Sequence, residues 1–209
     1  MTIIATVLKS GGSYTPEHVR MLEEQLGHDC PLTVYTDNLE LLAKRGSFAR
    51  RLTYQLPGWW SKMELFNPAL PDDIVFFDLD TVIRRRPRVL SQAVREPMML
   101  RDFYRPEGLQ SSIMCIPHHF KAYVWKHWME GPEEWMSLLS EQGLGDQAFL
   151  EKVSQKFWGI LQDKYPGEYV SWKADHLEQL PLPSTARVIV FHGQPKPWDI
   201  PNAHQTWRY

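Results

Sequence analysis

Apolar and polar residues follow one another in blocks that predict strands and helices in turn. An apolar run over 1–8 predicts a first strand, and the small residues at 10–13 predict a flexible turn after it. Thr15 and Pro16 are residue types favoured at the N-cap and first position of a helix, and Gly27 is a natural stop. The chain therefore begins with a predicted strand, turn and helix.

The same patterns predict further elements along the chain. In the first half they are a strand at 32–36, a short helix at 39–44, a weak strand at 51–56 and a helix at 59–66. In the less regular second half we expect strands at 98–101, 112–116, 168–172 and 187–191, and helices at 119–129, 133–140 and 146–156. Because strands and helices alternate, the order predicts an α/β fold with a mainly parallel central sheet flanked by helices.

The most informative block is the apolar run 74–77, which is followed by Asp78-Leu79-Asp80. Four apolar residues in a row are typical of a strand buried on both faces. Because side chains alternate along an extended chain, Asp78 and Asp80 can point the same way and share one divalent cation. Ligands of open α/β sheets bind beyond the carboxyl ends of the strands, which is where these acids are expected.

Composition narrows the class of protein. The 23 basic and 25 acidic residues nearly cancel, so no bulk charge points to a nucleic-acid partner. No segment approaches the ~20 apolar residues that span a bilayer, and the first residues lack a basic leader. Cys30 and Cys115 lack metal-ligand spacing, so we expect reduced thiols and a cytoplasmic protein.

Tryptophan is unusually frequent, with nine residues in the chain. We expect most of these side chains in the core, although carbohydrate-handling proteins also use flat aromatic surfaces. The tryptophans are Trp59, Trp60, Trp125, Trp128, Trp135, Trp158, Trp172, Trp198 and Trp207.

Two classes of enzyme place acids after a buried strand. The string 78–82 matches the start of haloacid-dehalogenase-like phosphatases, in which the first Asp attacks phosphorus and the second acts as acid/base. That class also needs an acidic pair after a later apolar strand, and the only later Gly-Asp, Gly145-Asp146, does not follow one. The other class is the glycosyltransferases with an Asp-x-Asp motif in mid-chain, where a Mn²⁺ or Mg²⁺ ion bridges the two phosphates of the donor.

The segment after the last predicted strand favours the second class. His192 at a strand end is a suitable third metal ligand, and Gly193 permits close approach of the backbone. Lys196 is a point charge suited to a diphosphate, and prolines on both sides restrict its loop. A strand-capping histidine and a stiff turn would be the structural alternative.

On these motifs the chain resembles family 8 of the glycosyltransferases, the glycogenin-like and lipooligosaccharide-galactosyltransferase group. The resemblance spans nearly the whole chain and implies the GT-A fold, a Rossmann-like nucleotide-diphospho-sugar transferase fold. It implies a single domain over 1–209, with a nucleotide-binding half at 1–83 and a donor-sugar and acceptor half at 84–209. The motifs are the opening strand with Tyr14, the helix with Lys62, Asp78-Leu79-Asp80, Asp146-Gln147 and His192-Gly193 with Lys196-Pro197-Trp198.

The resemblance also implies site residues. Asp78, Asp80 and His192 would hold Mn²⁺ or Mg²⁺. Asp146 and Gln147 would be the catalytic residues, with Gln147 acting as nucleophile or electrostatic helper. Residues implied to contact the nucleotide or its phosphates are Thr6, Val7, Tyr14, Asp37, Lys62, Gly193 and Lys196, and those implied to contact the donor sugar are Asp102, Ser111 and Asp146.

The sequence thus predicts a metal-dependent glycosyltransferase that moves a sugar from a nucleoside-diphosphate sugar, expected to be a UDP-sugar, to a saccharide or other hydroxyl acceptor with retention. The alternatives are the phosphatase that uses Asp78 and Asp80, and a nucleotide-sugar-binding protein without turnover. Two features depart from the family pattern. The stretch from His192 to Lys196 is shorter than usual, and Gln110-Ser111-Ser112 stands where the family shows Asn-x-Gly.

Overall fold

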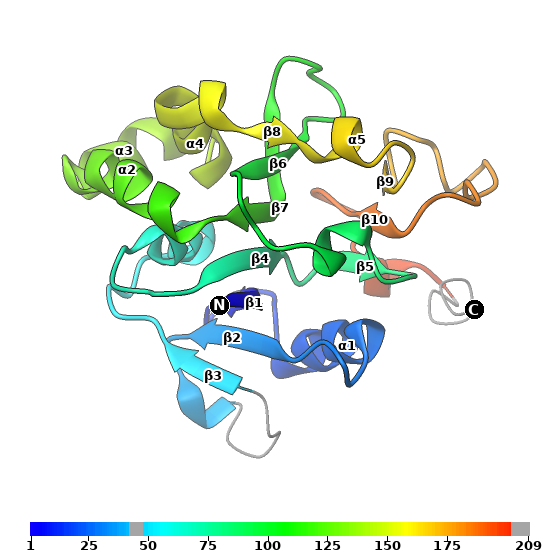
Figure 1. Cartoon of the computed structure of the whole chain (residues 1–209), viewed down its shortest axis with the longest axis horizontal. Coiled ribbons are helices and arrows are strands. Elements are labelled where there is room, and N and C mark those ends of the chain that lie inside the picture. The colour runs from blue at the N-terminus through cyan, green and yellow to red at the C-terminus, as the bar shows by residue number, and fades with distance from the viewer. Residues whose placement is uncertain (42–47, 202–209) are drawn as a thin grey trace.

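A mixed seven-stranded sheet forms the centre of the computed structural model, which describes residues 1–41 and 48–201 (Figure 1). Its strands are β1 (Thr2–Leu8), β2 (Leu32–Thr36), β3 (Phe48–Arg51), β4 (Asp73–Phe77), β6 (Met98–Arg101), β7 (Leu109–Ile116) and β8 (Gly159–Ile160). Their order is β3-β2-β1-β4-β7-β6-β8. β7 runs antiparallel to both of its neighbours, and the other pairs are parallel. The predicted mainly parallel central sheet is confirmed.

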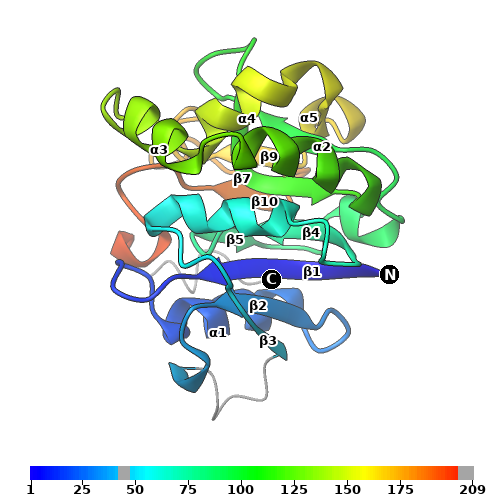
Figure 2. The ribbon, with the colours of Figure 1, turned by 90° about the vertical axis from the view of Figure 1, so that its left-hand side faces the viewer.

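Helices cover both faces of this sheet. α2, α3 and α4 group beside β7, away from α1, in both views (Figures 1 and 2). The α-helices are α1 (Pro16–Leu26), α2 (His118–Met129), α3 (Pro132–Ser140), α4 (Asp146–Ser154) and α5 (Leu161–Lys164). The 3₁₀ helices are η1 (Leu39–Leu41), η2 (Gly58–Phe66), η3 (Arg88–Ser91), η4 (Gln155–Phe157) and η5 (Pro197–Asp199).

β4 is buried on both faces, as its apolar run predicts. Ile74 and Phe76 belong to the core under η2, α2 and α4, whereas Val75 and Phe77 belong to the core under α1. Each fully buried side chain of this size stabilises the fold by roughly 1.5–3 kcal/mol. This anchoring holds the chain rigidly up to Asp78, whose backbone N–H donates to the Ser112 carbonyl at 2.8 Å.

A second, three-stranded sheet connects the acidic segment to the end of the chain. It consists of β5 (Thr81–Ile83), β10 (Val188–Val190) and β9 (Tyr169–Ser171). β10 lies antiparallel to β5 with Thr81 opposite Val190. Asp80, just before β5, and Phe191, just after β10, therefore lie at the same end of two paired strands, although they are far apart in the sequence.

Several predicted elements have different bounds. The strand expected at 51–56 is wrong beyond Arg51: the Leu52 N–H donates to the Thr36 carbonyl at 2.8 Å, and the Thr53 N–H donates to the Glu64 carboxylate. The helix expected at 146–156 ends at Ser154 and continues as η4. The two late strands are shorter than expected, and β5, β8 and α5 were not predicted.

The remaining expectations concern the membrane, the cysteines and the helix at 39–44. In 1–41 and 48–201, no helix is both long and apolar enough to cross a bilayer. Cys30 and Cys115 are buried free thiols, as predicted, and burial raises the pKa of Cys115 to about 12. The helix at 39–44 is present as η1, while 42–44 and Trp207 lie outside the described residues.

Candidate active site

A cavity of about 480 Å³ opens where β1 and β4 end. We call it the β1–β4 pocket. One wall is the β1–α1 loop from Lys9 to Tyr14, and the other is the start of η2 with Trp59 and Lys62. Val7 and Asp78 also line it. The pocket therefore lies at the carboxyl ends of parallel strands, as expected for an α/β ligand site.

Lys62 binds three oxygens at the inner end of this pocket. Its Nζ lies 3.3 Å from Asp78 Oδ2, 3.1 Å from Asp146 Oδ2 and 3.2 Å from Ser111 Oγ. These four residues, the Lys62 cluster, come from η2, the end of β4, the start of α4 and β7. The sequence-predicted residues Lys62, Asp78, Asp146 and Ser111 are thus brought together.

Electrostatics in the Lys62 cluster act in opposite directions on its members. Burial opposes the charge of Lys62, but Asp146 and Asp78 more than offset this and raise its pKa above the usual value. Burial raises the pKa of Asp78 to about 7; Lys62 opposes the rise, whereas Asp80 and Asp146 add to it. The single positive charge of Lys62 faces the carboxylates of Asp78 and Asp146, with Asp80 nearby, and cannot neutralise them all. The site is therefore suited to a further cation.

Asp80 belongs to a second group, the Lys196 cluster. Lys196 Nζ lies 2.5 Å from Asp80 Oδ2, and the Tyr14 hydroxyl donates to the same oxygen at 2.9 Å. Lys196 Nζ also lies 3.2 Å from the Tyr14 hydroxyl. Asp80 Oδ1 is buried and has no hydrogen-bond partner among the described residues. A buried, unpartnered carboxylate oxygen is a ready ligand for a hard cation.

His192 lies two residues after the end of β10. Its Nε2 is 2.7 Å from Ser171 Oγ, and its ring stacks on Phe103 with centroids 5.8 Å apart. Burial and then the charge of Lys173 lower its pKa, which keeps the imidazole in the neutral form that binds metals. Across 1–41 and 48–201, no three His, Cys, Asp or Glu side chains are grouped to hold a metal ion. The two carboxylates fit a cation, whereas His192 is occupied by Ser171.

Asp102 and Gln147 lie side by side. Gln147 Nε2 is 3.4 Å from Asp102 Oδ2, and Asp102 Oδ1 accepts the Tyr104 N–H at 2.8 Å. Burial alone would raise the pKa of Asp102, but the N–H groups of Tyr104 and Arg105 lower it. Asp102 is therefore held charged next to the first turn of α4, which carries Asp146 and Gln147.

Of the other residues predicted to contact the nucleotide, some line the β1–β4 pocket and some do not. Val7 lines the β1–β4 pocket, but Thr6 is fully buried and does not. Asp37 is occupied: it accepts from Lys9 Nζ at 2.7 Å and from the Ser10 backbone N–H at 2.8 Å. These bonds hold the β1–α1 loop. Burial alone would raise the pKa of Asp37, but the bonds from Lys9 and Ser10 outweigh burial and lower this pKa to about 2. Gly193 is exposed, with a left-handed φ of 68°.

Three residues at the site were not assigned roles in advance. Ser171 binds His192, and Trp198 stacks on His18 with ring centroids 3.8 Å apart. Trp59 lines the β1–β4 pocket and is 53% exposed. The Trp59-Trp60 pair offered a signal, because adjacent residues of a helix cannot both face the core.

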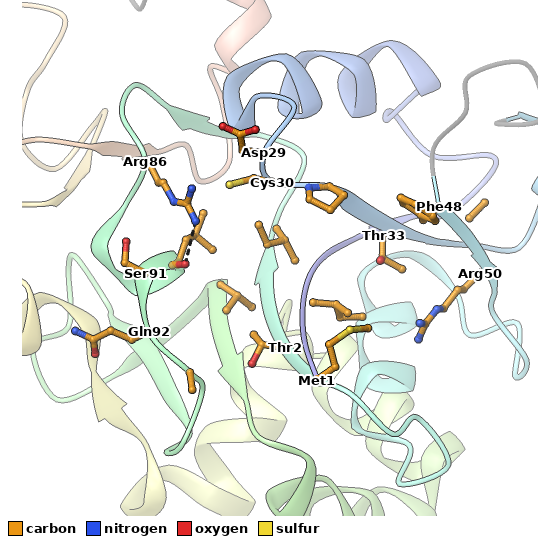
Figure 3. Close-up of a pocket in the computed structure, with 17 residues that line it drawn as sticks. Met1, Thr2, Asp29, Cys30, Thr33, Phe48, Arg50, Arg86, Ser91 and Gln92 are labelled. Carbon is orange, nitrogen blue, oxygen red and sulfur yellow. Dashed lines mark hydrogen bonds between the residues drawn. The ribbon is translucent and has the colours of Figure 1, made fainter.

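A larger cavity of about 980 Å³ lies at the opposite, amino ends of β1 and β2 (Figure 3). Its two arginines already have partners: Arg86 donates to the Leu90 carbonyl at 3.3 Å, and Arg50 to Asp72 at 2.7 Å. None of the predicted site residues lines this cavity. The size of a cavity therefore does not identify the candidate site. The β1–β4 pocket is distinguished by the charged side chains that meet at its inner end.

Comparison with known proteins identifies the fold. No model of a known protein family and no curated protein matches the chain. Among solved structures, it is similar to the glycosyltransferase GlyE of Streptococcus pneumoniae TIGR4, with 12% identity and a TM-score of 0.63 over 98% of this chain and 58% of that one. It is also similar to the galactosyltransferase LgtC in complex with donor and acceptor sugar analogues, with 11% identity and a TM-score of 0.67 over 99% of this chain and 94% of that one.

The chain therefore has the fold of the GT-A glycosyltransferases, as its sequence predicts. It spans less than two thirds of GlyE and nearly all of LgtC.

Proposed function

We propose that the chain is a glycosyltransferase of family 8 that moves a sugar from a nucleoside-diphosphate sugar to a saccharide or other hydroxyl acceptor. The observation that carries the proposal is the convergence of two carboxylates and two lysines at the carboxyl end of β4 in this fold. LgtC, which has the same fold, was crystallised with donor and acceptor sugar analogues. A uridine donor, retention of configuration and the division into halves at 1–83 and 84–209 are parts of the proposal.

A divalent cation fits the carboxylates at this position. Asp78 and Asp80 would hold Mn²⁺ or Mg²⁺, and the orphan Asp80 Oδ1 supports that assignment. His192 would be the third ligand after exchanging its bond to Ser171. When bound, the cation would offset negative charge on the departing diphosphate.

The side chains around this position would bind and orient the donor. Lys196 would contact the diphosphate as a point charge, and Lys62 would hold Asp78 and Asp146 in place. Asp102 and Asp146 would accept hydrogen bonds from hydroxyls of the donor sugar. This arrangement stabilises charge that develops as the sugar leaves, which is where electrostatic preorganisation is most effective.

Gln147 would lie nearest the reacting carbon. Its amide is positioned by Asp102, and one LgtC structure is an active-site variant in which a glutamine is replaced by glutamate. A neutral amide is a weak nucleophile. We therefore propose that the acceptor attacks the sugar on the face from which the diphosphate leaves, with Gln147 as electrostatic helper.

The test is release of UDP from a panel of UDP-sugars, with and without saccharide acceptors, in Mn²⁺ and in EDTA. We expect metal-dependent release that increases with a suitable acceptor, and loss of at least about 100-fold in Asp78→Asn. Asp163→Asn is the matched control, because Asp163 is 59% exposed, lies on α5 and belongs to neither the Lys62 cluster nor the Lys196 cluster. Donor binding without release would indicate a binding protein, and phosphate release from phosphomonoesters would indicate the phosphatase.

A further inference from the structure

Three lysines around the candidate site pair with carboxylates, and a fourth does not. Lys9 pairs with Asp37 at 2.7 Å, and Lys62 and Lys196 are each held in the clusters that bear their names. Lys173 is partly buried, and in the part of the chain that the structure describes it makes no ion pair with a carboxylate. A partly buried charge without a counterion is unfavourable, so it favours an anionic ligand.

Strand pairing brings Lys173 to the same end of the three-stranded sheet as the acidic segment. Ser171, the last residue of β9, pairs with Val190 of β10, and Val190 pairs with Thr81 of β5. Asp80 directly precedes Thr81, and Lys173 follows Ser171 by two residues. Lys173 therefore leaves this small sheet at the end where the proposed metal ligand Asp80 lies.

The acid nearest to Lys173 in the sequence is engaged elsewhere. The Asp175 carboxylate accepts the Ser171 backbone N–H at 2.7 Å, and the Asp175 N–H donates to the Ser171 carbonyl at 3.2 Å. The Lys173 carbonyl accepts the His176 N–H at 3.1 Å. These bonds fix the turn after β9, so the backbone of Lys173 is held in place while its ammonium remains available.

The ammonium of Lys173 lies beside the segment that follows β10. A Cβ added to Gly193 would come within 3.2 Å of Lys173 Nζ, so a larger residue at this position would crowd the ammonium. The charge of Lys173 also acts on His192, where it is the largest cause after burial of the lowered pKa. Lys173 thus lies next to the stretch from His192 to Lys196, which the proposed function places at the diphosphate.

We propose that Lys173 binds the diphosphate of the donor and is the lysine that can do so without giving up a carboxylate. This inference rests on the proposed function and adds a residue to it. Lys196 must exchange Asp80 for a phosphate, whereas Lys173 has no such bond to break. The stretch from His192 to Lys196 is shorter than in the family, so it offers fewer backbone donors to the phosphates. Lys173 supplies a charged donor from a separate turn.

The test measures binding of UDP and of pyrophosphate to the full chain by calorimetry in Mg²⁺. We expect Lys173→Met to weaken both ligands by similar factors, on the order of 10-fold or more, because a charged contact to the phosphates is lost. Lys173→Arg should restore most of the affinity. The urea midpoint of Lys173→Met should equal that of the unaltered protein, since Lys173 has no carboxylate partner among the described residues.

Two controls separate the phosphate contact from other effects. Lys126→Met removes an exposed lysine on α2 and should leave both affinities unchanged. Binding of Mn²⁺ without nucleotide, followed by electron paramagnetic resonance, should be no weaker in Lys173→Met, because removing a positive charge cannot repel the ion. A loss of Mn²⁺ binding that matches the loss of UDP binding would overturn the inference.

Other outcomes would also overturn it. Unchanged binding of UDP and pyrophosphate in Lys173→Met would do so, and if only the KM for an acidic acceptor rises, Lys173 belongs to the acceptor site. A lowered urea midpoint that Lys173→Arg does not restore would assign Lys173 a structural role instead. In each of these cases the unaltered protein still binds UDP. Failure of the unaltered protein to bind any nucleoside diphosphate overturns the proposed function as well.

Discussion

Asp78 and Asp80 are two residues apart, yet their charges are balanced by different parts of the molecule. Asp78 pairs with Lys62, which is 10% exposed and lies on η2, a helix that packs against α2 and α4. Asp80 pairs with Lys196, which is 16% exposed and lies on the segment after β10. The first lysine is part of the packed core, whereas the second is brought in by the end of the chain.

This difference gives the two lysine clusters different roles: the Lys62 cluster stabilises the fold, and the Lys196 cluster is available to bind a ligand. The Lys62 cluster joins η2, β4, β7 and α4, so its lysine cannot leave without depriving Asp78 and the buried Asp146 of their shared cation. The Lys196 cluster depends on one short strand pair, β5 with β10. Lys196 can therefore exchange Asp80 for a phosphate at much lower cost. We expect substitutions to affect mainly stability in the first cluster and mainly donor binding in the second.

The largest effect is expected for Lys62→Met, which keeps the side chain's length and removes its charge. It leaves Asp78 and Asp146 without their shared cation, and breaking a buried pair from one side costs about 3–5 kcal/mol. Urea denaturation measures the free energy of unfolding. Lys126→Met is the control at an exposed position. A loss below about 1 kcal/mol would show that Lys62 has no structural role.

A smaller effect on stability is expected for Lys196→Met. Asp80 keeps the hydrogen bond from Tyr14, so the cost of the lost partner is about 1–3 kcal/mol. The main result should be a raised KM for the sugar donor, on the order of 10-fold or more, because a charged contact to the diphosphate is lost. Steady-state kinetics against Lys126→Met measures it. If Lys196→Met lowers the free energy of unfolding as much as Lys62→Met does, the two clusters contribute equally to stability and the proposed difference between them is wrong.

A third effect, which changes no side chain, concerns pH. In the folded protein without metal, burial, Asp80 and Asp146 raise the pKa of Asp78 to about 7 despite Lys62, against about 3.8 for an unperturbed Asp. Between these values the folded protein holds a proton that the unfolded chain has lost, so stability falls as pH rises from about 4 to 7. A difference of about three pKa units corresponds to at most about 4 kcal/mol, so we expect a decrease of up to about 4 kcal/mol, which Asp78→Asn removes.

This pH effect is measured by urea denaturation in EDTA at pH 5 and pH 8, in the unaltered protein and in Asp78→Asn. The difference in free energy of unfolding between the two proteins should change with pH. A difference that is the same at both values would contradict the raised pKa of Asp78.

Local pattern was enough to predict most of the first half of the fold. The helix bounded by Thr15 and Gly27 and the strand before Asp78 have the expected limits within a residue, because caps and apolar runs act over a few positions. The strand expected at 51–56 failed for a tertiary reason. The Thr53 N–H is satisfied by the Glu64 side chain instead of a neighbouring strand. Asp37 was expected to contact the nucleotide, and its partners Lys9 and Ser10 are likewise visible only in the fold.

The sequence by itself determined that Asp78 and Asp80 follow a strand buried on both faces, since that depends only on neighbouring residues. It also marked His192 and Lys196 as candidates by their residue types. Only the tertiary structure decided which lysine meets which acid. The pairing of β5 with β10 joins segments about a hundred residues apart, and the register of such a pair depends on packing in the assembled sheets.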